Sequence, residues 1–340
     1  AAEDLVASGC NLIISNSYGH QSFMAEVAQE YPDIQFVSAT GDFASISGIN
    51  NFSNAFTNIY EARYVSGIVG GMKLKELIDN NKLTDANKDG ENYKIGYVGA
   101  YTYAEVISGY TAFYLGVKSV VSNVTMSVEF TDSWFDIDKE GAAAENLVNQ
   151  GCVIIGQHAD STGAPSKCET LLKNGKTCYS VGYNVDMLSV APNAALTSST
   201  NNWEVYYEYA MKSAMEGKKI KTDWSEGYKS GAVGITKLGD SAATGTAEAV
   251  AAAEKQMKEG TFHVFDTTKF TVDNQKLTSH KHDFSFMDFT TNPATVVYKG
   301  DTLETVKTEG NASYVEESVV RSAPYFDIYI DGINWTNKTK

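Results

Sequence analysis

Short apolar runs alternate with longer amphipathic stretches over residues 1–265. The runs LII at 12–14 and VII at 153–155 are each preceded closely by a glycine, a residue preferred just after a helix end, and are short enough to be buried strands. The full pattern predicts helices over about 20–30, 106–120 and 165–173, and strands over 34–38, 93–100, 126–130, 153–156 and 178–181. Such an alternation of helix and strand is typical of an α/β fold.

A repeat divides this pattern into two similar parts. AEDLVASGCNLII at 2–14 matches AENLVNQGCVIIG at 144–156, and NIYEARY at 58–64 matches NNWEVYY at 201–207 at nearly the same spacing. The two copies predict two lobes of similar fold in tandem. The strand, helix and strand at 93–130 have no counterpart before Ala1, so about 50 residues of the natural chain are expected to precede this sequence. We therefore expect a vacant position beside strand 12–15, whereas strand 95–98 fills that position in the other lobe.

The expected class is α/β with two lobes and a β-rich C-terminal extension. Short stretches such as ATVVYKGDTL and YFDIYIDG combine strand-forming and turn-forming residues, which predicts β structure after residue 265. The expected units are lobe one at 1–80, an interlobe linker at 81–92, lobe two at 93–218, a return segment to lobe one at 219–265 and the extension at 266–340. In the linker, DANKDG at 85–90 matches the start of a calcium loop, but Gly96 stands where the loop requires glutamate. A solvated turn is favoured, with a weak calcium site as the alternative.

Charge and composition exclude several classes of partner. The formal net charge is −15 and the pI is near 4.8, so nucleic acid and anionic lipid surfaces are not expected to bind. The most apolar stretch, 64–72, is interrupted by glycines and predicts no membrane span. Cysteines and histidines show no metal-ligand spacing, and we expect no metal and no cofactor. Cys10 and Cys152 belong to separate lobes and are not expected to pair. For Cys168 and Cys178, both a disulfide and free thiols are compatible with the sequence.

Several longer motifs occur in one order along the chain. They are LIISNSYGHQSFMAEVAQEYPDIQFV, EARYVSGIVGGM, KIGYVGAYTYAEVISGYTAFYLGVKSV, FTDSWFDIDKEGAAAENLVNQGCVII, and VGYNVD followed by LTSST. This order resembles the basic membrane protein (BMP) family of PnrA-like substrate-binding lipoproteins, which serve ABC importers and bind purine nucleosides. The resemblance implies a periplasmic-binding-protein-like fold, in which two Rossmann-like lobes joined by a hinge close on a ligand. It also implies an extracytoplasmic lipoprotein, whose anchor and first base-contacting residues would precede Ala1.

Candidate ligand residues follow from the rule that open α/β sheets bind ligands beyond the carboxyl ends of their strands. By resemblance, Trp134 stacks on the base, with Phe135 as a substitute and packing at a lobe edge as the alternative role. Asn184 stands where the family has an aspartate that accepts hydrogen bonds from the ribose hydroxyls, and an amide accepts only on its oxygen. Asp186 keeps a second acidic position of the family or caps the next helix. The other candidates that follow strands, for which a turn role is the alternative, are Asn16, Tyr18, Asp42, Tyr101, His158 and Asp160. Lys229 is a candidate by resemblance only, because the family has a lysine near this region that reaches the sugar, and a surface lysine is the favoured alternative.

Catalytic motifs do not occur in the sequence. There is no G-x-S-x-G, Walker A or H-E-x-x-H motif, and the acidic residues at 132–140 are typical of a helix start. We therefore predict a monomeric solute-binding protein that takes a purine nucleoside by hinge closure and passes it to an ABC permease. A sugar- or free-base-binding protein of the same fold is one alternative. A nucleoside-cleaving enzyme is the alternative from another class.

Overall fold

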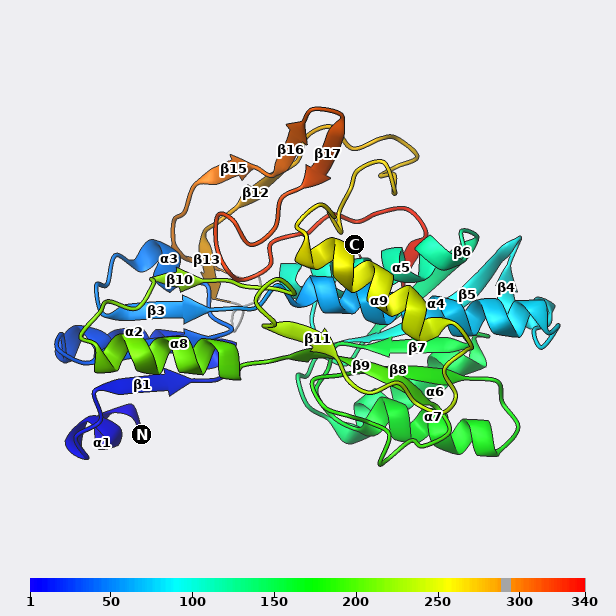
Figure 1. The fold of residues 1–340 in the computed structure, drawn as a ribbon, viewed down its shortest axis with the longest axis horizontal. Coiled ribbons are helices and arrows are strands. Elements are labelled where there is room, and N and C mark those ends of the chain that lie inside the picture. Colours follow the sequence, from blue (N-terminus) through cyan, green and yellow to red (C-terminus); the bar gives the residue numbers. More distant parts are fainter. Residues whose placement is uncertain (289–294, 340) are drawn as a thin grey trace.

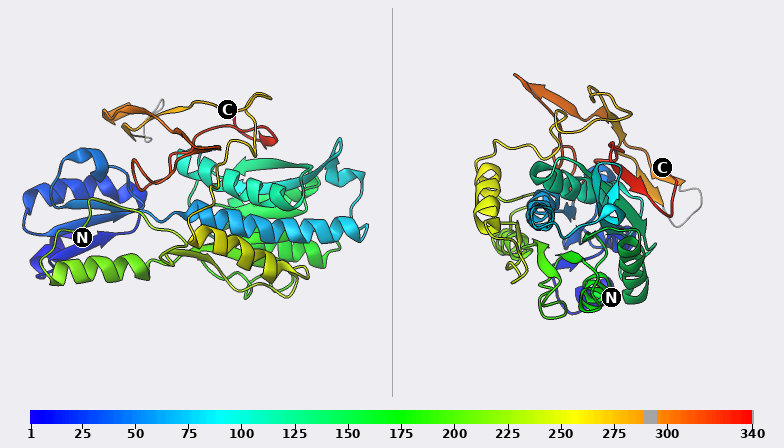
Figure 2. Two further views of the ribbon diagram at one scale, coloured as in Figure 1. Left: turned by 45° about the horizontal axis from the view of Figure 1, so that its top comes forward. Right: turned by 90° about the vertical axis from the view of Figure 1, so that its right-hand side faces the viewer.

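Two β-sheets with helices on both faces form the two lobes, and a β-rich segment lies along one side of them (Figure 1, Figure 2). The computed structural model describes residues 1–288 and 295–339. The predicted α/β class with two lobes and a β-rich extension is confirmed.

The first lobe is built on a parallel sheet of order β1-β2-β3-β10. Its side chains alternate between the two faces, as a strand requires. Ile13 and Phe36 pack with Met24 of α2 on one face, and Val37 packs with Tyr206 of α8 on the other. The elements are α1 (Ala2–Ala7), β1 (Leu12–Ser15), η1 (Tyr18–His20), α2 (Gln21–Glu30), β2 (Gln35–Ala39), α3 (Ala44–Ser47), β3 (Phe52–Ala55), α8 (Glu204–Met215) and β10 (Asp223–Trp224).

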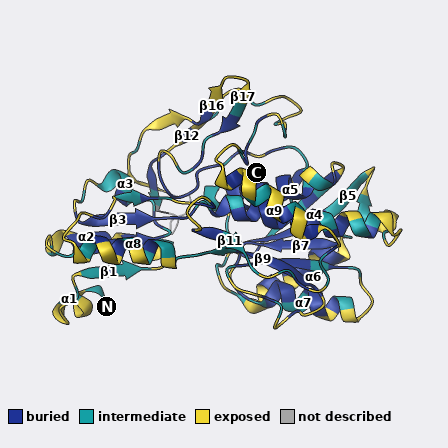
Figure 3. Cartoon of the chain, viewed as in Figure 1, coloured by how far each residue is buried: buried dark blue, intermediate teal, exposed yellow. Residues whose placement is uncertain are grey.

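The second lobe is built on a larger sheet of order β11-β9-β8-β7-β5-β6-β18, in which β11 is antiparallel. Tyr97 and Ile154 face α4 and α5, whereas Val98 and Ile155 face α6 and α7. Figure 3 shows these strands buried between helices whose outer sides are exposed. The elements are α4 (Ile59–Asp79), η2 (Asp85–Asn87), β4 (Lys88–Asp89), β5 (Asn92–Gly99), α5 (Ala104–Val120), β6 (Val124–Phe130), α6 (Ile137–Asn149), β7 (Ile154–Gln157), α7 (Gly163–Lys173), β8 (Tyr179–Tyr183), β9 (Ala195–Asn201), β11 (Val233–Ile235) and α9 (Thr246–Lys258).

Three helices pack on a different lobe from the one to which the expected boundaries assign them. Helix α4 falls in the range 1–80 but packs on α5 of the second lobe, and α8 falls in 93–218 but packs on the first sheet. Helix α9, in the expected return segment to lobe one, packs beside α4 (Figure 1). The hydrophobic pattern specifies that a helix is buried, but it does not specify which sheet buries it. The expected ranges are therefore corrected at these helices.

The segments between β3 and α4, between β9 and α8, and between β10 and β11 connect the lobes. Asn58 donates its backbone N–H to Glu226 O at 2.8 Å, and Asn202 donates to Ala232 O at 2.8 Å. These hydrogen bonds hold the crossing segments side by side. They form the hinge region of the fold.

The edge positions of the two sheets differ as predicted. Within the described residues, β1 pairs only with β2, whereas its repeat counterpart β7 lies between β5 and β8. The strand expected beside β7, 95–98, is part of β5.

In the described part of the C-terminal extension there are three antiparallel strand pairs and one strand that returns to the second lobe. β12 pairs with β15, β13 with β14 and β16 with β17, while β18 pairs in parallel with β6. The strands are β12 (Lys281–Asp283), β13 (Phe286–Asp288), β14 (Thr295–Tyr298), β15 (Thr302–Glu304), β16 (Val306–Glu309), β17 (Ala312–Val315) and β18 (Ile333–Trp335).

The remaining local expectations concern metal, thiols and membrane. DANKDG forms η2 and β4, where Asn87 accepts a hydrogen bond from Thr84 N at 3.0 Å, and no group of three or more acidic, histidine or cysteine side chains suited to a metal occurs in the described residues. All four cysteines are free thiols, and Cys178 donates to the carbonyl oxygen of Cys168 at 3.4 Å. Over the described ranges, no helix is long and apolar enough to cross a membrane.

Candidate functional site

The sequence-predicted residues lie after the carboxyl ends of strands in both sheets, as expected for an open α/β fold. Asn16 and Tyr18 follow β1, Asp42 follows β2, Tyr101 follows β5, Trp134 follows β6, His158 and Asp160 follow β7, and Asn184 and Asp186 follow β8. The contacts below join part of this set into one region. We call that region the interlobe site, consisting of Tyr18, Asp42, Tyr101, Tyr103, Trp134, Asp160 and Asn184.

Three aromatic side chains of the second lobe form a wall of the interlobe site. Tyr101 and Tyr103 stack with ring centroids 5.0 Å apart and planes 6° apart. Trp134 lies 5.1 Å from Tyr101 and 6.0 Å from Tyr103, and its side chain is half-buried. The alternative residue Phe135 is 63% exposed. Trp134 therefore has the packed, partly open position that stacking on a flat ligand requires.

A polar pair lies next to this aromatic wall. Asp160 donates its backbone N–H to Trp134 O at 2.7 Å, and its carboxylate accepts a hydrogen bond from Asn184 Nδ2 at 3.1 Å. Asn184 Oδ1 in turn accepts from Asn201 Nδ2 at 2.8 Å. The backbone of Asn184 is left-handed, with φ of 64°, a conformation that asparagine tolerates well. These contacts fix the amide of Asn184, so Asp160 is the acidic group that the second lobe contributes to the site.

Desolvation in this region changes the ionisation of Asp160. Although more than a third of the residue reaches solvent, the surrounding protein raises the pKa of its carboxyl to about 6. Glu105 and Glu140 raise this pKa further, and Arg63 and the hydrogen bond from Asn184 oppose the rise. Asp160 is therefore an ionised hydrogen-bond acceptor at neutral pH and becomes a neutral acid at mildly acidic pH.

His158 is buried in the second lobe and packs against Trp134 of the aromatic wall. It is only 2% exposed, its Nε2 lies 2.7 Å from Glu105 Oε2, and its ring centroid is 6.2 Å from that of Trp134. Burial, followed by the nearby charge of Arg63, lowers the pKa of His158. His158 therefore packs behind Trp134 in the protein interior, and its side chain is not exposed to a ligand.

Sequence reasoning missed Arg63, the charged residue beneath the site. Its guanidinium donates to Tyr97 Oη at 2.7 Å and to Gln157 O at 3.0 Å, and it lies 4.0 Å above the Tyr183 ring. Its Nε and Nη2 have no hydrogen-bond partner among the described residues. The signal available in the sequence is its rarity, because Arg63 and Arg321 are the only arginines among 27 basic residues.

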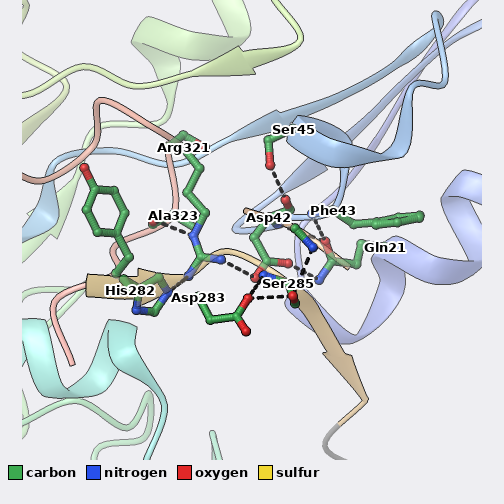
Figure 4. Close-up of polar contacts among 12 residues, drawn as sticks. Gln21, Asp42, Phe43, Ser45, His282, Asp283, Ser285, Arg321 and Ala323 are labelled. Carbon is green, nitrogen blue, oxygen red and sulfur yellow. Dashed lines mark hydrogen bonds and ion pairs between the residues drawn. The ribbon is translucent and has the colours of Figure 1, made fainter. Parts of the chain in front are cut away.

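The first lobe contributes Tyr18 and Asp42. The Tyr18 ring lies 6.3 Å from the Tyr103 ring, which joins the two lobes at the aromatic wall. Asp42 accepts a hydrogen bond from Gln21 Nε2 at 3.1 Å and forms an ion pair with Arg321 of the extension (Figure 4). Tyr18 is therefore brought against the second-lobe residues, whereas Asp42 pairs with Gln21 of its own lobe and with the extension.

The other predicted residues lie outside this set of contacts. Asn16, Asp186 and Lys229 are exposed. Asp186 accepts the backbone N–H of Leu188 at 2.7 Å and caps a turn. None of the hydrogen bonds and ion pairs described in the structure joins Lys229 to the interlobe site.

Comparisons with known proteins identify the family of the chain. Residues 1–266 match the family described as ABC transporter substrate-binding protein PnrA-like. A purine-binding protein of Brucella abortus is 31% identical over 230 residues, which are 67% of this chain and 58% of that protein. A putative ABC transporter glucose-binding protein of Haloferax volcanii is 27% identical over 268 residues, which are 79% of this chain and 62% of that protein. The chain thus spans less than two thirds of the length of either relative.

A similar fold occurs among solved structures. The structure of an ABC transporter solute-binding protein from Aeropyrum pernix has a TM-score of 0.62 at 15% identity, covering 76% of this chain and 78% of that one. This similarity concerns the fold alone.

Proposed function

Because the chain belongs to the family of PnrA-like ABC transporter substrate-binding proteins, we propose that it captures a purine nucleoside at the interlobe site and delivers it to an ABC permease. In this proposal the protein works outside the cytoplasm as a monomer held to the membrane by a lipid anchor. The cycle is hinge closure around the ligand, with no bond made or broken.

The observation that carries the proposal is the aromatic wall directly beside a carboxylate. Trp134 has a large π surface that suits a purine, and the backbone hydrogen bond of 2.7 Å from Asp160 N–H to Trp134 O keeps the two residues adjacent. In this proposal the Asp160 carboxylate accepts hydrogen bonds from the ribose hydroxyls. Tyr18 and Asp42 would complete the site from the first lobe when the hinge closes. A nucleoside has both the flat base and the vicinal hydroxyls that this arrangement suits.

A sugar is the second candidate ligand. Asp160 and Asn184, joined at 3.1 Å, also suit the hydroxyls of a free sugar, and aromatic rings pack on sugar faces. The Haloferax relative is described as a putative glucose-binding protein. A sugar would leave most of the aromatic wall formed by Tyr101, Tyr103 and Trp134 unused, so the nucleoside is preferred.

Calorimetric titration of the full-length protein tests the proposal. Guanosine, inosine and adenosine are compared with guanine, ribose and glucose at one pH and one salt concentration. At least one nucleoside is expected to bind more tightly than its base and its sugar measured separately. Binding of glucose or ribose without binding of any nucleoside would replace the nucleoside by a sugar.

Incubation with guanosine separates binding from catalysis. Chromatography of the mixture after several hours is expected to recover intact guanosine. Free guanine that accumulates in proportion to protein concentration would favour the nucleoside-cleaving enzyme, and Glu105→Gln and Asp160→Asn would then identify the responsible carboxylate.

A further inference from the structure

The extension reaches the interlobe site through a buried guanidinium. Arg321 is 8% exposed, and its Nη1 lies 3.5 Å from Asp42 Oδ2 (Figure 4). Its Nε donates to Ala323 O at 3.2 Å, and its Nη2 lies 3.5 Å from His282 Nε2. The guanidinium is thus held by its own segment and by β12, and it is directed at a carboxylate of the first lobe.

Asp42 is held from the opposite side by Gln21. The side-chain amide donates to Asp42 Oδ1 at 3.1 Å, and its oxygen accepts from the backbone N–H of Asp42 at 2.9 Å. Burial raises the pKa of the Asp42 carboxyl, and Arg321 is the largest influence that lowers it again. Without the guanidinium, the buried carboxyl would be easier to protonate.

The Arg321–Asp42 pair lies at the first-lobe end of the interlobe site. Both groups act electrostatically on the Tyr18 hydroxyl, and the Tyr18 ring contacts Tyr103 across the lobes at 6.3 Å. Tyr103 in turn lies 6.0 Å from Trp134. The row of side chains from Trp134 through Tyr103 and Tyr18 therefore ends at Asp42.

We propose that Arg321 is a positioning residue of the interlobe site: the extension sets its guanidinium against Asp42 and keeps that carboxylate charged and oriented as an acceptor for a hydroxyl or N–H group of the ligand. The family match ends at residue 266, so this function belongs to the extension and is specific to chains that carry it. The proposal rests on ligand binding at the interlobe site, as proposed above.

A second contact between the extension and the first lobe does not involve Asp42. Ser322 donates its backbone N–H to Asp223 Oδ2 at 2.6 Å and its hydroxyl to Asp223 Oδ1 at 2.5 Å. Ser322→Ala removes the hydroxyl contact one residue from Arg321 and leaves the Arg321–Asp42 pair in place. It is therefore the matched control for a merely structural attachment.

The test compares Arg321→Met, Arg321→Lys and Ser322→Ala with the wild type by calorimetry with guanosine and glucose between pH 5.5 and 8.5. The groups that face Asp42 are Arg321 and His282 of the extension and Tyr18 of the first lobe. Because Arg321 contacts His282 at 3.5 Å and acts electrostatically on Tyr18, each comparison is repeated in an Asp42→Asn background, which separates the effect on the Asp42 carboxylate from effects on these two neighbours. Thermal unfolding of each protein, followed by circular dichroism, checks that it is folded.

We expect the Kd ratio for Arg321→Met to rise as the pH falls, reaching roughly 10- to 100-fold at pH 6, because a protonated Asp42 no longer accepts a charge-assisted hydrogen bond. Arg321→Lys keeps the charge and should remain within about threefold of the wild type, and the Ser322→Ala ratio should not depend on pH. In an Asp42→Asn background, Arg321→Met should have no further effect, since the carboxylate that it acts on is gone.

Three outcomes overturn the positioning function of Arg321, the nucleoside proposal, or both. A pH-independent ratio for Arg321→Met, in a folded wild type and variant that both bind ligand, removes the positioning function and leaves the proposed function intact. A wild type that binds glucose but no nucleoside ends the nucleoside proposal, and the same ratios measured with glucose still decide the function of Arg321. A wild type that binds neither ligand overturns both.

Discussion

At the scale of single residues, stacking on Trp134 should dominate nucleoside affinity. One aromatic partner contributes on the order of 1 to 3 kcal/mol to base stacking, so Trp134→Ala should weaken binding roughly 5- to 150-fold. Trp134→Phe keeps a π face and should bind nearly as tightly as the wild type. Calorimetry with guanosine measures both, and Phe135→Ala is the control because Phe135 is 63% exposed. Equal affinity of Trp134→Ala and the wild type would contradict the stacking function.

Asp160 should make affinity depend on pH in the mildly acidic range. Its pKa is raised to about 6, so protonation on going below that pH removes an acceptor, and Kd should rise by up to about tenfold per pH unit. Asp160→Asn lacks this titration, and its Kd should stay flat from pH 5 to 8. A wild-type profile parallel to that of Asp160→Asn would show that Asp160 does not contact ligand.

The pH dependence of folding stability at Asp160 should be opposite to that of ligand affinity: stability should fall as the pH rises. A carboxyl whose pKa is higher in the folded protein than in the unfolded chain destabilises the fold as the pH rises from about 4 through 6. Asp160→Asn should therefore gain stability relative to the wild type above pH 6. Melting temperatures of the ligand-free proteins at pH 4.5 and pH 7.5 measure the difference, and a constant difference between the two pH values would contradict it.

Residues of the interlobe site could be predicted only where a simple rule placed them. Trp134, Asp160 and Asn184 follow strands, and the strands were visible as short apolar runs. Arg63 lies inside a helix whose apolar sequence predicts only a buried core element. Its function could not be predicted because it depends on residues that are distant in the sequence and become neighbours only in the fold. The pairing of Arg321 with Asp42 joins distant parts of the chain, and no local pattern records it.

At the scale of elements, helix and strand positions followed from the repeat, but their partners did not. Helices α4 and α8 begin within two residues of matched positions of the repeat and pack in opposite lobes. Their apolar content predicts burial equally well against either sheet. The lobe boundaries could not be predicted for the same reason, since the chain crosses the hinge on either side of α8.

The crossing of α4 and α5 depends on two glycines. An added Cβ on Gly116 would lie 2.1 Å from Tyr64 O, and one on Gly67 would lie 2.2 Å from Phe113 O. Gly116→Ala should therefore lower the free energy of unfolding by about 1–3 kcal/mol, because the helices must separate. Urea unfolding measures this change.

The control for this prediction is Gly141→Ala in α6, where the nearest atom to an added Cβ is 3.6 Å away. Alanine has the higher helix propensity, so this variant should gain about 0.5–1 kcal/mol. Loss of stability in both variants would indicate a general cost of the substitution and contradict the close crossing as its cause.

At the scale of the whole molecule, the extension is attached to both lobes and should limit their separation. On the second lobe, β18 extends the sheet beside β6, and Asn337 Nδ2 donates to Phe130 O at 2.8 Å. On the first lobe, Phe43 stacks on Phe286 at 4.8 Å and meets Tyr298 edge-on at 5.6 Å. When the lobes separate by hinge motion, the extension must either deform or lose its contacts with one lobe.

Phe43→Ala should therefore allow the ligand-free lobes to open further. The substitution removes the aromatic contact between the first lobe and the extension and leaves β18 on the second lobe in place. Small-angle X-ray scattering should show a larger radius of gyration for the ligand-free variant than for the wild type, and saturating ligand should bring the two together, because the closed state is fixed by the ligand. Phe23→Ala, at a side chain 69% exposed on the first lobe, is the control and should match the wild type. An unchanged radius in Phe43→Ala would contradict the aromatic contact as a restraint on opening, since, of the contacts described above, only Arg321–Asp42 and Ser322–Asp223 still join the extension to the first lobe in that variant.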